Sequence, residues 1–257
     1  MSITFDLRDS IAFVRLNRPE KLNALTGAML TELGEMFERI KEEQSVRAVI
    51  LTGVGRRAFS AGTDIAELST IAAEEARGVA KRGQDVCEKI ERCGVPVIAA
   101  VNGIAAGGGC ELALACHIRI ASTAARFSLP EIKLGVISAY GGTQRLSRVT
   151  GSGRALEMML TGAEVSVEEA LRVGLVNRVV APARLLTEAE SLARDISKLS
   201  PLAIRACLEA VTRGLGMTLE DGLRLEAELF SRLFDTEDVR EGTRAFLEKR
   251  APVFKGR

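Results

Sequence analysis

Short apolar runs alternate with amphipathic stretches through the first two-thirds of this chain. Residues 3–7 (ITFDL) and 11–16 (IAFVRL) alternate apolar and polar positions, which predicts two strands joined as a hairpin. Residues 46–53 (VRAVILTG) and 96–103 (PVIAAVNG) predict buried strands, and the second is too apolar to face water on either side. Strands of this kind are typical of a covered, mostly parallel sheet.

Apolar residues at helical spacing fill the intervals between these strands. Residues 26–43 predict a helix that begins at Thr26, a residue type that caps helices well, and residues 72–93 predict another. Residues 118–122 and 125–129 predict two short strands. This order of strands and helices predicts an α/β core with right-handed crossovers.

From Ala139 onward the pattern is almost wholly helical, with one interruption at residues 174–180. The last ~75 residues predict three or four amphipathic helices, and one of them begins at the Ser-Pro pair of residues 200–201 and ends at Gly214. We therefore divide the chain into a core of residues 1–190 and a helical C-terminal region of residues 191–257. That region could complete its own core or pack against a neighbouring subunit.

The composition excludes several broad classes of protein. Of 257 residues, 47% are hydrophobic and 27% are charged, and 35 basic side chains nearly balance 34 acidic ones. A net charge of +1 indicates no general attraction to nucleic acid or to a membrane. The first residues predict a hairpin rather than a signal peptide, and no apolar run approaches the ~20 residues that span a bilayer. We expect a cytoplasmic protein.

The cysteines and the histidine give no metal motif. The five cysteines are odd in number and show no C-x-x-C spacing, so we interpret them as small core residues of a reducing compartment. His117 is the single histidine, which excludes a His-rich metal site, and its apolar surroundings indicate a structural role. We expect no metal.

A run of three glycines, residues 107–109, stands where a strand turns into an apolar helix. Glycine lets a ligand approach the backbone, and a helix N-terminus presents unpaired N–H groups, so this place suits an anion or a developing oxyanion. Glu111 falls in the first turn of that helix, and we expect it to be partly buried. From the residues alone, a catalytic Glu111 and a first-turn acid favoured by the helix dipole are equally good interpretations.

Two further stretches complete the pattern. Glu131 follows Pro130 at a helix start, where a purely structural acid is the simpler interpretation. Residues 60–62 end a strand, and Thr63 is expected to open the next helix, which would leave its backbone N–H free.

These stretches, in this order, resemble the crotonase (enoyl-CoA hydratase/isomerase) superfamily, closest to the 2-enoyl-CoA hydratases. The resemblance covers essentially the whole chain through these segments: RPEKLNAL (18–25), AFSAGTDI (58–65), IAAVNGIAAGGGCELALAC (98–116), PEIKLGVI (130–137), GGTQRL (141–146), LTGAEVSVEEALRVGLVN (160–177) and KRAPVF (249–254). It implies an α/β fold, a spiral of ββα units with a helical C-terminal trimerisation region. It also implies a homotrimer or a dimer of trimers.

The resemblance implies the roles of the catalytic residues. The N–H groups of Thr63 and Gly108 would bind the thioester carbonyl oxygen, Glu111 would activate water for attack on Cβ, and Glu131 would protonate Cα. The reaction implied is hydration of a 2-enoyl-CoA to a 3-hydroxyacyl-CoA, and coenzyme A, as part of the substrate, is the only cofactor-like group. The acyl-CoA contacts it implies involve Lys21, Leu22, Ala24, Ser60, Ala61, Gly62, Thr63, Asp64, Ile65, Gly107, Gly108, Tyr140, Gly141, Phe254 and Lys255.

Alternatives within this fold stay open. An isomerase, a decarboxylase or a thioester hydrolase could use the same oxyanion hole, and the hydrated acyl group could be cyclic or dienoyl. A non-catalytic RNA-binding member would show a basic stripe with interleaved aromatic residues, which this balanced chain with 4% aromatic residues does not show.

The chain departs from the family pattern at one loop. Relatives usually read GxIPGxGGTQRL after the second glutamate, whereas this chain reads GVISAYGGTQRL. Ser138 stands in place of the proline, and Tyr140, the only tyrosine, precedes the glycines. One hypothesis is that Tyr140 reshapes the acyl pocket to favour a branched or cyclic group, and the alternative is a core tyrosine.

Overall fold

The computed structural model describes residues 2–257, in which two sheets lie side by side. The larger sheet has the strand order β1-β2-β3-β5-β7-β10. Its first two strands form the predicted antiparallel hairpin, and every other neighbouring pair in it is parallel. The strands are β1 (Ile3–Arg8), β2 (Ile11–Leu16), β3 (Ala48–Gly53), β5 (Val97–Val101), β7 (Ile118–Ser122) and β10 (Arg178–Val180).

Three strands of the larger sheet are each followed along the chain by a strand of the smaller sheet. Its order is β4 (Ala58–Ser60), β6 (Ile104–Ala106), β8 (Arg126–Ser128) and β9 (Val165–Ser166). β4 follows β3, β6 follows β5 and β8 follows β7, and helical segments come next each time. The chain is thus a spiral of ββα units, as predicted, and only the two-residue β9 falls where the sequence pattern indicated helix alone.

The larger sheet is covered on both faces, and successive side chains of β3 and β5 point alternately to one face and the other. All residues of β3 and β5 are buried. Val49 and Leu51 face the main core below α1 (Gly27–Glu42), α3 (Ala76–Glu91) and α4 (Gly108–Ala115), whereas Ala48 and Ile50 face a second core. That second core is closed by α8 (Leu185–Ser197), which contributes buried leucine and alanine side chains.

The helix boundaries follow the predicted signals in two places and depart from them in a third. Thr26 Oγ1 accepts a hydrogen bond from Met29 N and starts α1, and Ser200 caps α9 (Pro201–Gly214) in the same way. The prediction that Thr63 opens a helix is wrong. Asp64 caps α2 (Ile65–Leu68), because its carboxylate can accept from Ala66 N, while Thr63 pairs with Leu25 in the connection between β2 and α1.

Short helical elements connect the strands and the longer helices. They are η1 (Pro19–Lys21), η2 (Pro130–Leu134), η3 (Pro182–Arg184), α5 (Gly142–Thr150), α6 (Ser152–Thr161) and α7 (Val167–Arg172). The helical start predicted at Pro130 is present, as the 3₁₀ turn η2.

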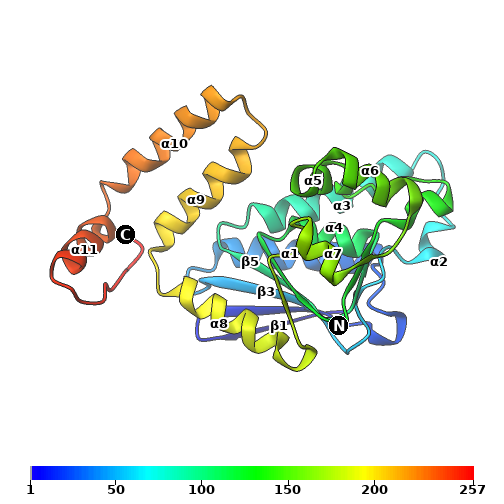
Figure 1. Cartoon of the computed structure of the whole chain (residues 1–257), viewed down its shortest axis with the longest axis horizontal. Coiled ribbons are helices and arrows are strands. Elements are labelled where there is room, and N and C mark those ends of the chain that lie inside the picture. The colour runs from blue at the N-terminus through cyan, green and yellow to red at the C-terminus, as the bar shows by residue number, and fades with distance from the viewer. Residues whose placement is uncertain (1) are drawn as a thin grey trace.

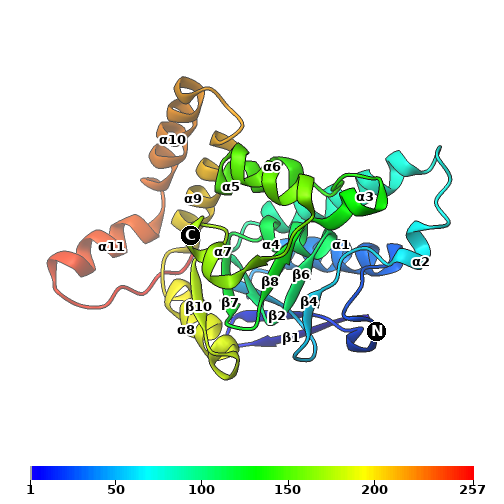
Figure 2. The same cartoon turned by 45° about the vertical axis from the view of Figure 1, so that its right-hand side comes forward.

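Three C-terminal helices extend away from the two sheets, as Figures 1 and 2 show. They are α9, α10 (Leu219–Leu233) and α11 (Glu237–Leu247). The predicted boundary after residue 190 falls inside α8, which packs on the large sheet, and α9 is the first helix that leaves it. These helices and their connections expose large apolar side chains: Val211, Leu215, Leu219, Leu223, Phe230, Phe234, Phe246 and Leu247.

Four of the five cysteines and His117 have the structural character that the sequence indicates, whereas the prediction of a core position is wrong for Cys207. Cys87, Cys93, Cys110 and Cys116 are buried and unpaired, and Cys207 is exposed. His117 Nδ1 accepts from Val97 N, and its Nε2 bonds to the Glu91 carbonyl. Within residues 2–257 no three His, Cys, Asp or Glu side chains are grouped so as to hold a metal ion. Over the same residues, no helix is both long and apolar enough to cross a bilayer.

Candidate functional site

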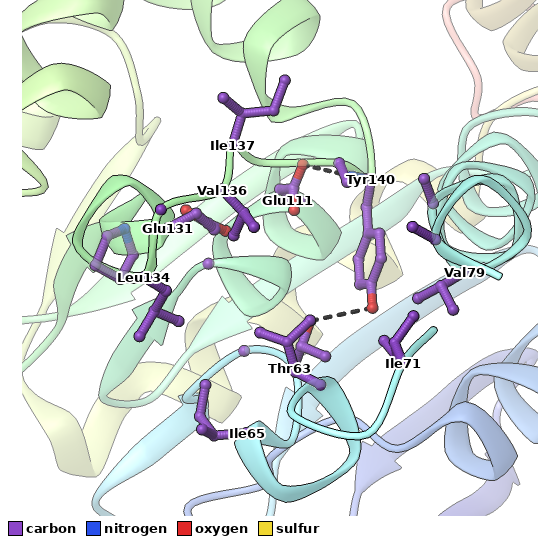
Figure 3. Close-up of a pocket in the computed structure, with 18 of the residues that line it drawn as sticks. Thr63, Ile65, Ile71, Val79, Glu111, Glu131, Leu134, Val136, Ile137 and Tyr140 are labelled. Atoms are coloured by element: carbon purple, nitrogen blue, oxygen red, sulfur yellow. Dashed lines mark hydrogen bonds between the residues drawn. The ribbon is translucent and has the colours of Figure 1, made fainter. Parts of the chain in front are cut away.

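One cavity of about 830 Å³ brings the three predicted stretches together. It lies between α2, the first turns of α3, the start of α4 and the loop that joins η2 to α5 (Figure 3). Its walls are mainly apolar, and Glu111 and Glu131 both line it. A concave, mostly apolar site with a few convergent polar groups is the usual form of a small-molecule site.

Two glycine loops meet beside this cavity. Gly62 and Gly107 have positive φ angles of 93° and 50°, which side-chain-bearing residues rarely adopt. A Cβ atom on Gly62 would lie 2.7 Å from the Ala106 carbonyl oxygen and 3.3 Å from Gly108 N. A Cβ atom on Gly107 would lie 2.9 Å from Glu131 Oε1. The glycines are therefore needed for the two loops to touch and for Glu131 to approach them.

This contact places two unused backbone donors near each other. Leu25 N donates to the Gly62 carbonyl and Asp64 N donates to the Leu25 carbonyl, so the bridge holds the residues on both sides of Thr63. Gly108 is the first residue of α4, where the N–H has no partner within the helix. Among the described residues, neither Thr63 N nor Gly108 N donates to a protein acceptor. The pair can receive a ligand oxygen.

Glu111 is a buried carboxyl group held by backbone amides. It lies in the first turn of α4 and is 2% exposed, so it is more deeply buried than the sequence indicated. Its Oε1 accepts from Tyr140 N at 2.8 Å and from Gly142 N at 2.6 Å. Burial raises the pKa of Glu111 to about 7, against the two N–H donors and with a contribution from the charge of Glu131. Near neutral pH, this group can therefore both accept and donate a proton.

Glu131 approaches the same space from η2. It is half-buried, and its Oε2 accepts from Ser138 Oγ at 2.9 Å. Burial raises its pKa above the ordinary value. Figure 3 shows both carboxyl groups directed into the cavity. Two carboxyl groups in unlike environments can divide the roles of acid and base between them.

Tyr140 connects the two sides of the cavity. Its ring is 4% exposed and lies between α3 and α4 (Figure 3). Its hydroxyl oxygen accepts from Thr63 Oγ1 at 3.0 Å, and its backbone N–H holds Glu111. Tyr140 thus lies at the cavity wall with a satisfied hydroxyl, and it contacts both Thr63 and Glu111.

The structure brings part of the predicted acyl-CoA set to the cavity. The predicted residues that line it, besides the two glutamates, are Ala61, Gly62, Thr63, Ile65, Gly107 and Tyr140. Ser60 and Asp64 have other partners: Ser60 Oγ donates to the Asn23 carbonyl, and the Asp64 carboxylate pairs with Arg18 at 3.1 Å.

Other predicted contacts lie outside the cavity wall. Lys21, Leu22 and Ala24 belong to the loop that follows β2, and Gly141 starts α5 behind Tyr140. Phe254 and Lys255 lie in a tail folded on α11, where Lys255 N donates to Asp238 at 2.8 Å. Figure 1 places this C-terminal end at the opposite side of the molecule from α2. Within one chain, the tail does not reach the cavity.

The apolar walls of the cavity were not predicted from the sequence. Ile71 and Val79 line one side, and Leu134, Val136 and Ile137 line the other. Ile137 is 69% exposed. The sequence signal for the second wall was a loop with several apolar residues between Glu131 and the glycine pair at 141–142. An exposed loop that binds nothing is usually polar, so these residues indicated a binding surface.

Comparisons with known proteins agree with this geometry. The family model for enoyl-CoA hydratase/isomerase matches residues 6–257. The short-chain-enoyl-CoA hydratase of Clostridium acetobutylicum is 42% identical over 97% of this chain and 95% of that protein. The crotonyl-CoA hydratase of Syntrophomonas wolfei is 40% identical over 98% of this chain and 97% of that protein.

A solved structure gives the same result in three dimensions. The crystal structure of an enoyl-CoA hydratase from Bacillus anthracis superposes with a TM-score of 0.97 at 40% identity, and all of both chains is covered. The assignment to a family follows from three findings. The two sheets are joined by ββα units, two glycine loops are in contact, and the family model matches nearly the whole chain. The chain belongs to the enoyl-CoA hydratase/isomerase family, the crotonase superfamily that its motifs indicate.

Proposed function

We propose that this protein adds water to a 2-enoyl-CoA thioester and forms a 3-hydroxyacyl-CoA. The observation that carries the proposal is the joint placement of two carboxyl groups and two unused backbone N–H groups around one cavity. The names of the relatives support the same reaction, since two proteins of about 40% identity are enoyl-CoA hydratases.

The first role belongs to the backbone. The thioester carbonyl oxygen would accept from Thr63 N and Gly108 N, and the N-terminus of α4 adds positive potential at that oxygen. As the reaction proceeds, negative charge gathers there in an enolate. Donors that are already in place are worth roughly 10²–10³ each in rate, because they need no reorganisation as the charge develops.

The second role belongs to the glutamates. Ionised Glu111 takes a proton from water while the water oxygen bonds to Cβ, and the C=C π electrons move toward the carbonyl. Protonated Glu131 then gives its proton to Cα as the enolate returns to a thioester. Exchange with solvent restores the starting protonation of both groups. Burial raises the pKa of both carboxyls, and the charge of Glu131 further raises the pKa of Glu111, which disfavours ionisation of both groups at once.

The chemistry needs no metal and no redox group. Electrons stay within the substrate, and the thioester itself makes Cα acidic. Coenzyme A enters as part of the substrate, and we expect no resident cofactor.

The test is a paired assay with crotonyl-CoA. Loss of the enoyl absorbance without release of free thiol supports hydration, whereas equal release of thiol would identify a thioester hydrolase. Glu111→Gln and Glu131→Gln should each lose ~10²–10⁴ in kcat. Glu157→Gln, which changes an exposed carboxyl on α6, is the matched control. Losses near those of the control would reject the two-glutamate mechanism.

We further propose a cytoplasmic homotrimer or dimer of trimers. The exposed apolar side chains of α9–α11 support association through the C-terminal region. In such an assembly, Phe254 and Lys255 could contact the coenzyme A of a neighbouring subunit. Light scattering of the intact protein tests the assembly state, and a monomer at working concentration would reject it.

A further inference from the structure

The ring of Tyr140 packs against two glycines, Gly83 on α3 and Gly108 at the start of α4. A Cβ atom on Gly83 would lie 1.9 Å from Tyr140 Cδ1, and one on Gly108 would lie 2.8 Å from Tyr140 Cε2. One edge of the ring therefore packs on α3 and the other edge packs on the start of α4. No other residue type would leave room for the ring at either position without a shift.

Gly83 has no other evident reason to be glycine. It lies inside α3, where glycine is about 1 kcal/mol less favourable than alanine, and its φ angle is not positive. It is buried, and all three atoms nearest to its absent Cβ belong to the Tyr140 ring. The helix thus accepts a poor helix former so that the ring fits.

The ring is also fixed at its two ends. Thr63 Oγ1 bonds to the hydroxyl at 3.0 Å, and the backbone N–H of Tyr140 bonds to Glu111. Arg145 Nη1 donates to the Tyr140 carbonyl and its Nη2 pairs with Glu91 on α3. A side chain held in this way is part of the wall and does not move aside at low cost.

The position of the Tyr140 ring relative to the reacting atoms follows from the proposed mechanism. With the carbonyl oxygen at Thr63 and Gly108 and Cβ facing Glu111, the carbons beyond Cβ run toward the groups between Glu111 and Thr63. Figure 3 shows the Tyr140 ring there, between Glu111 above, Thr63 below and α3 beyond. Gly83, which the ring covers, is the part of α3 that a longer acyl chain would otherwise reach.

We propose that Tyr140 closes the acyl end of the cavity and restricts the enzyme to short, uncharged 2-enoyl thioesters. This rests on the proposed hydratase function and names its substrate class. We expect an uncharged acyl group because of the residues that line the cavity. Among the described residues, this lining includes two carboxyl groups and no Lys, Arg or His side chain. A carboxylate on the acyl group would be repelled by the ionised Glu111 and would find no cation in the lining.

The test measures kcat/KM for crotonyl-CoA, trans-2-decenoyl-CoA, cyclohexene-carboxyl-CoA and the carboxylated glutaconyl-CoA. The wild-type enzyme should favour crotonyl-CoA over each of the others by at least about tenfold. Tyr140→Ala should reduce the preference for crotonyl-CoA over decenoyl-CoA by at least about tenfold, because it opens the space between α3 and α4. Tyr140→Phe keeps the ring and should keep the chain-length ratio, whatever it does to the absolute rate.

Several results would overturn the proposal. A folded Tyr140→Ala enzyme with the wild-type chain-length ratio would do so, as would wild-type turnover of decenoyl-, cyclohexene-carboxyl- or glutaconyl-CoA equal to that of crotonyl-CoA. Inhibition constants of butyryl-CoA and decanoyl-CoA provide a readout that does not depend on catalysis, and Tyr140→Leu provides a second variant if alanine prevents folding. Hydration of crotonyl-CoA by the wild type tests the function itself, so the two failures are distinct.

Discussion

Glu111 should lower the stability of the protein in a pH-dependent way, and Glu111→Gln should reverse that effect. The folded protein holds this proton up to a pKa of about 7, whereas the unfolded chain releases it near 4.5. Below 4.5 both states are protonated and the carboxyl makes no difference. Between 4.5 and about 7 stability falls as pH rises, and above that range the full cost of the buried charge is present.

The size of the effect follows from the pKa. A rise from 4.5 to about 7 corresponds to about 3 kcal/mol at a pH above both values. Glutamine resembles the protonated carboxyl, and its Oε1 can still accept from Tyr140 N and Gly142 N. The variant should therefore match the wild type near pH 4.5 and exceed its stability by about 3 kcal/mol at pH 8.5.

Denaturant unfolding at several pH values and one protein concentration measures this difference. Glu157→Gln controls for the loss of a surface charge, because that side chain is exposed and pairs with Arg154 on the same helix. A gain for Glu111→Gln that is the same at pH 5 and pH 8.5 would refute burial as the cause. A loss of stability at both pH values would show that the carboxylate is net stabilising in its place.

Three further predictions concern other parts of the site and the tail. Gly83→Ala should destabilise by about 1–3 kcal/mol through contact with the Tyr140 ring, yet in a Tyr140→Ala background the same change should stabilise by up to about 1 kcal/mol; unfolding of all four proteins checks the reversal. The pH profile of kcat/KM should fall below about pH 7 rather than below 4.5, because Glu111 must be ionised to activate water. Asp238→Ala should cost about 1–3 kcal/mol, since the buried carboxylate accepts from Ser200 Oγ and from the N–H groups of residues 255 and 256, and hydrogen exchange should rise in the tail.

Much of the fold was predictable because burial periodicity and capping signals are local. The strands at residues 48–53 and 97–101 are mainly apolar and buried throughout, and the helix starts at Thr26 and Ser200 carry cap residues, so both kinds of element follow from short segments. β9 could not be predicted, because two residues have no periodicity and their pairing partner, β8, lies about 40 residues earlier.

The candidate site was predictable in its chemistry and less so in its walls. The glycines and both glutamates stand in recognisable motifs, and the structure places them around one cavity. The sequence could not show that Asp64 pairs with Arg18 rather than facing the ligand, nor that Gly83 receives the Tyr140 ring. Both are contacts between residues 46 and 57 positions apart, and local patterns carry no information at that distance.

The two amide donors beside Gly62 and at Gly108 belong to the main chain, and this affects how the site tolerates mutation. Exchange of the Thr63 side chain leaves its N–H in place, so the proposed oxyanion hole should be insensitive to most changes at residue 63. The vulnerable positions are instead Gly62, where any side chain would separate the two loops, and Gly107, where it would displace Glu131. Variation in substrate range is thereby left to the exposed wall of residues 134–137 and to position 140, which an engineer could diversify while the reaction itself is retained.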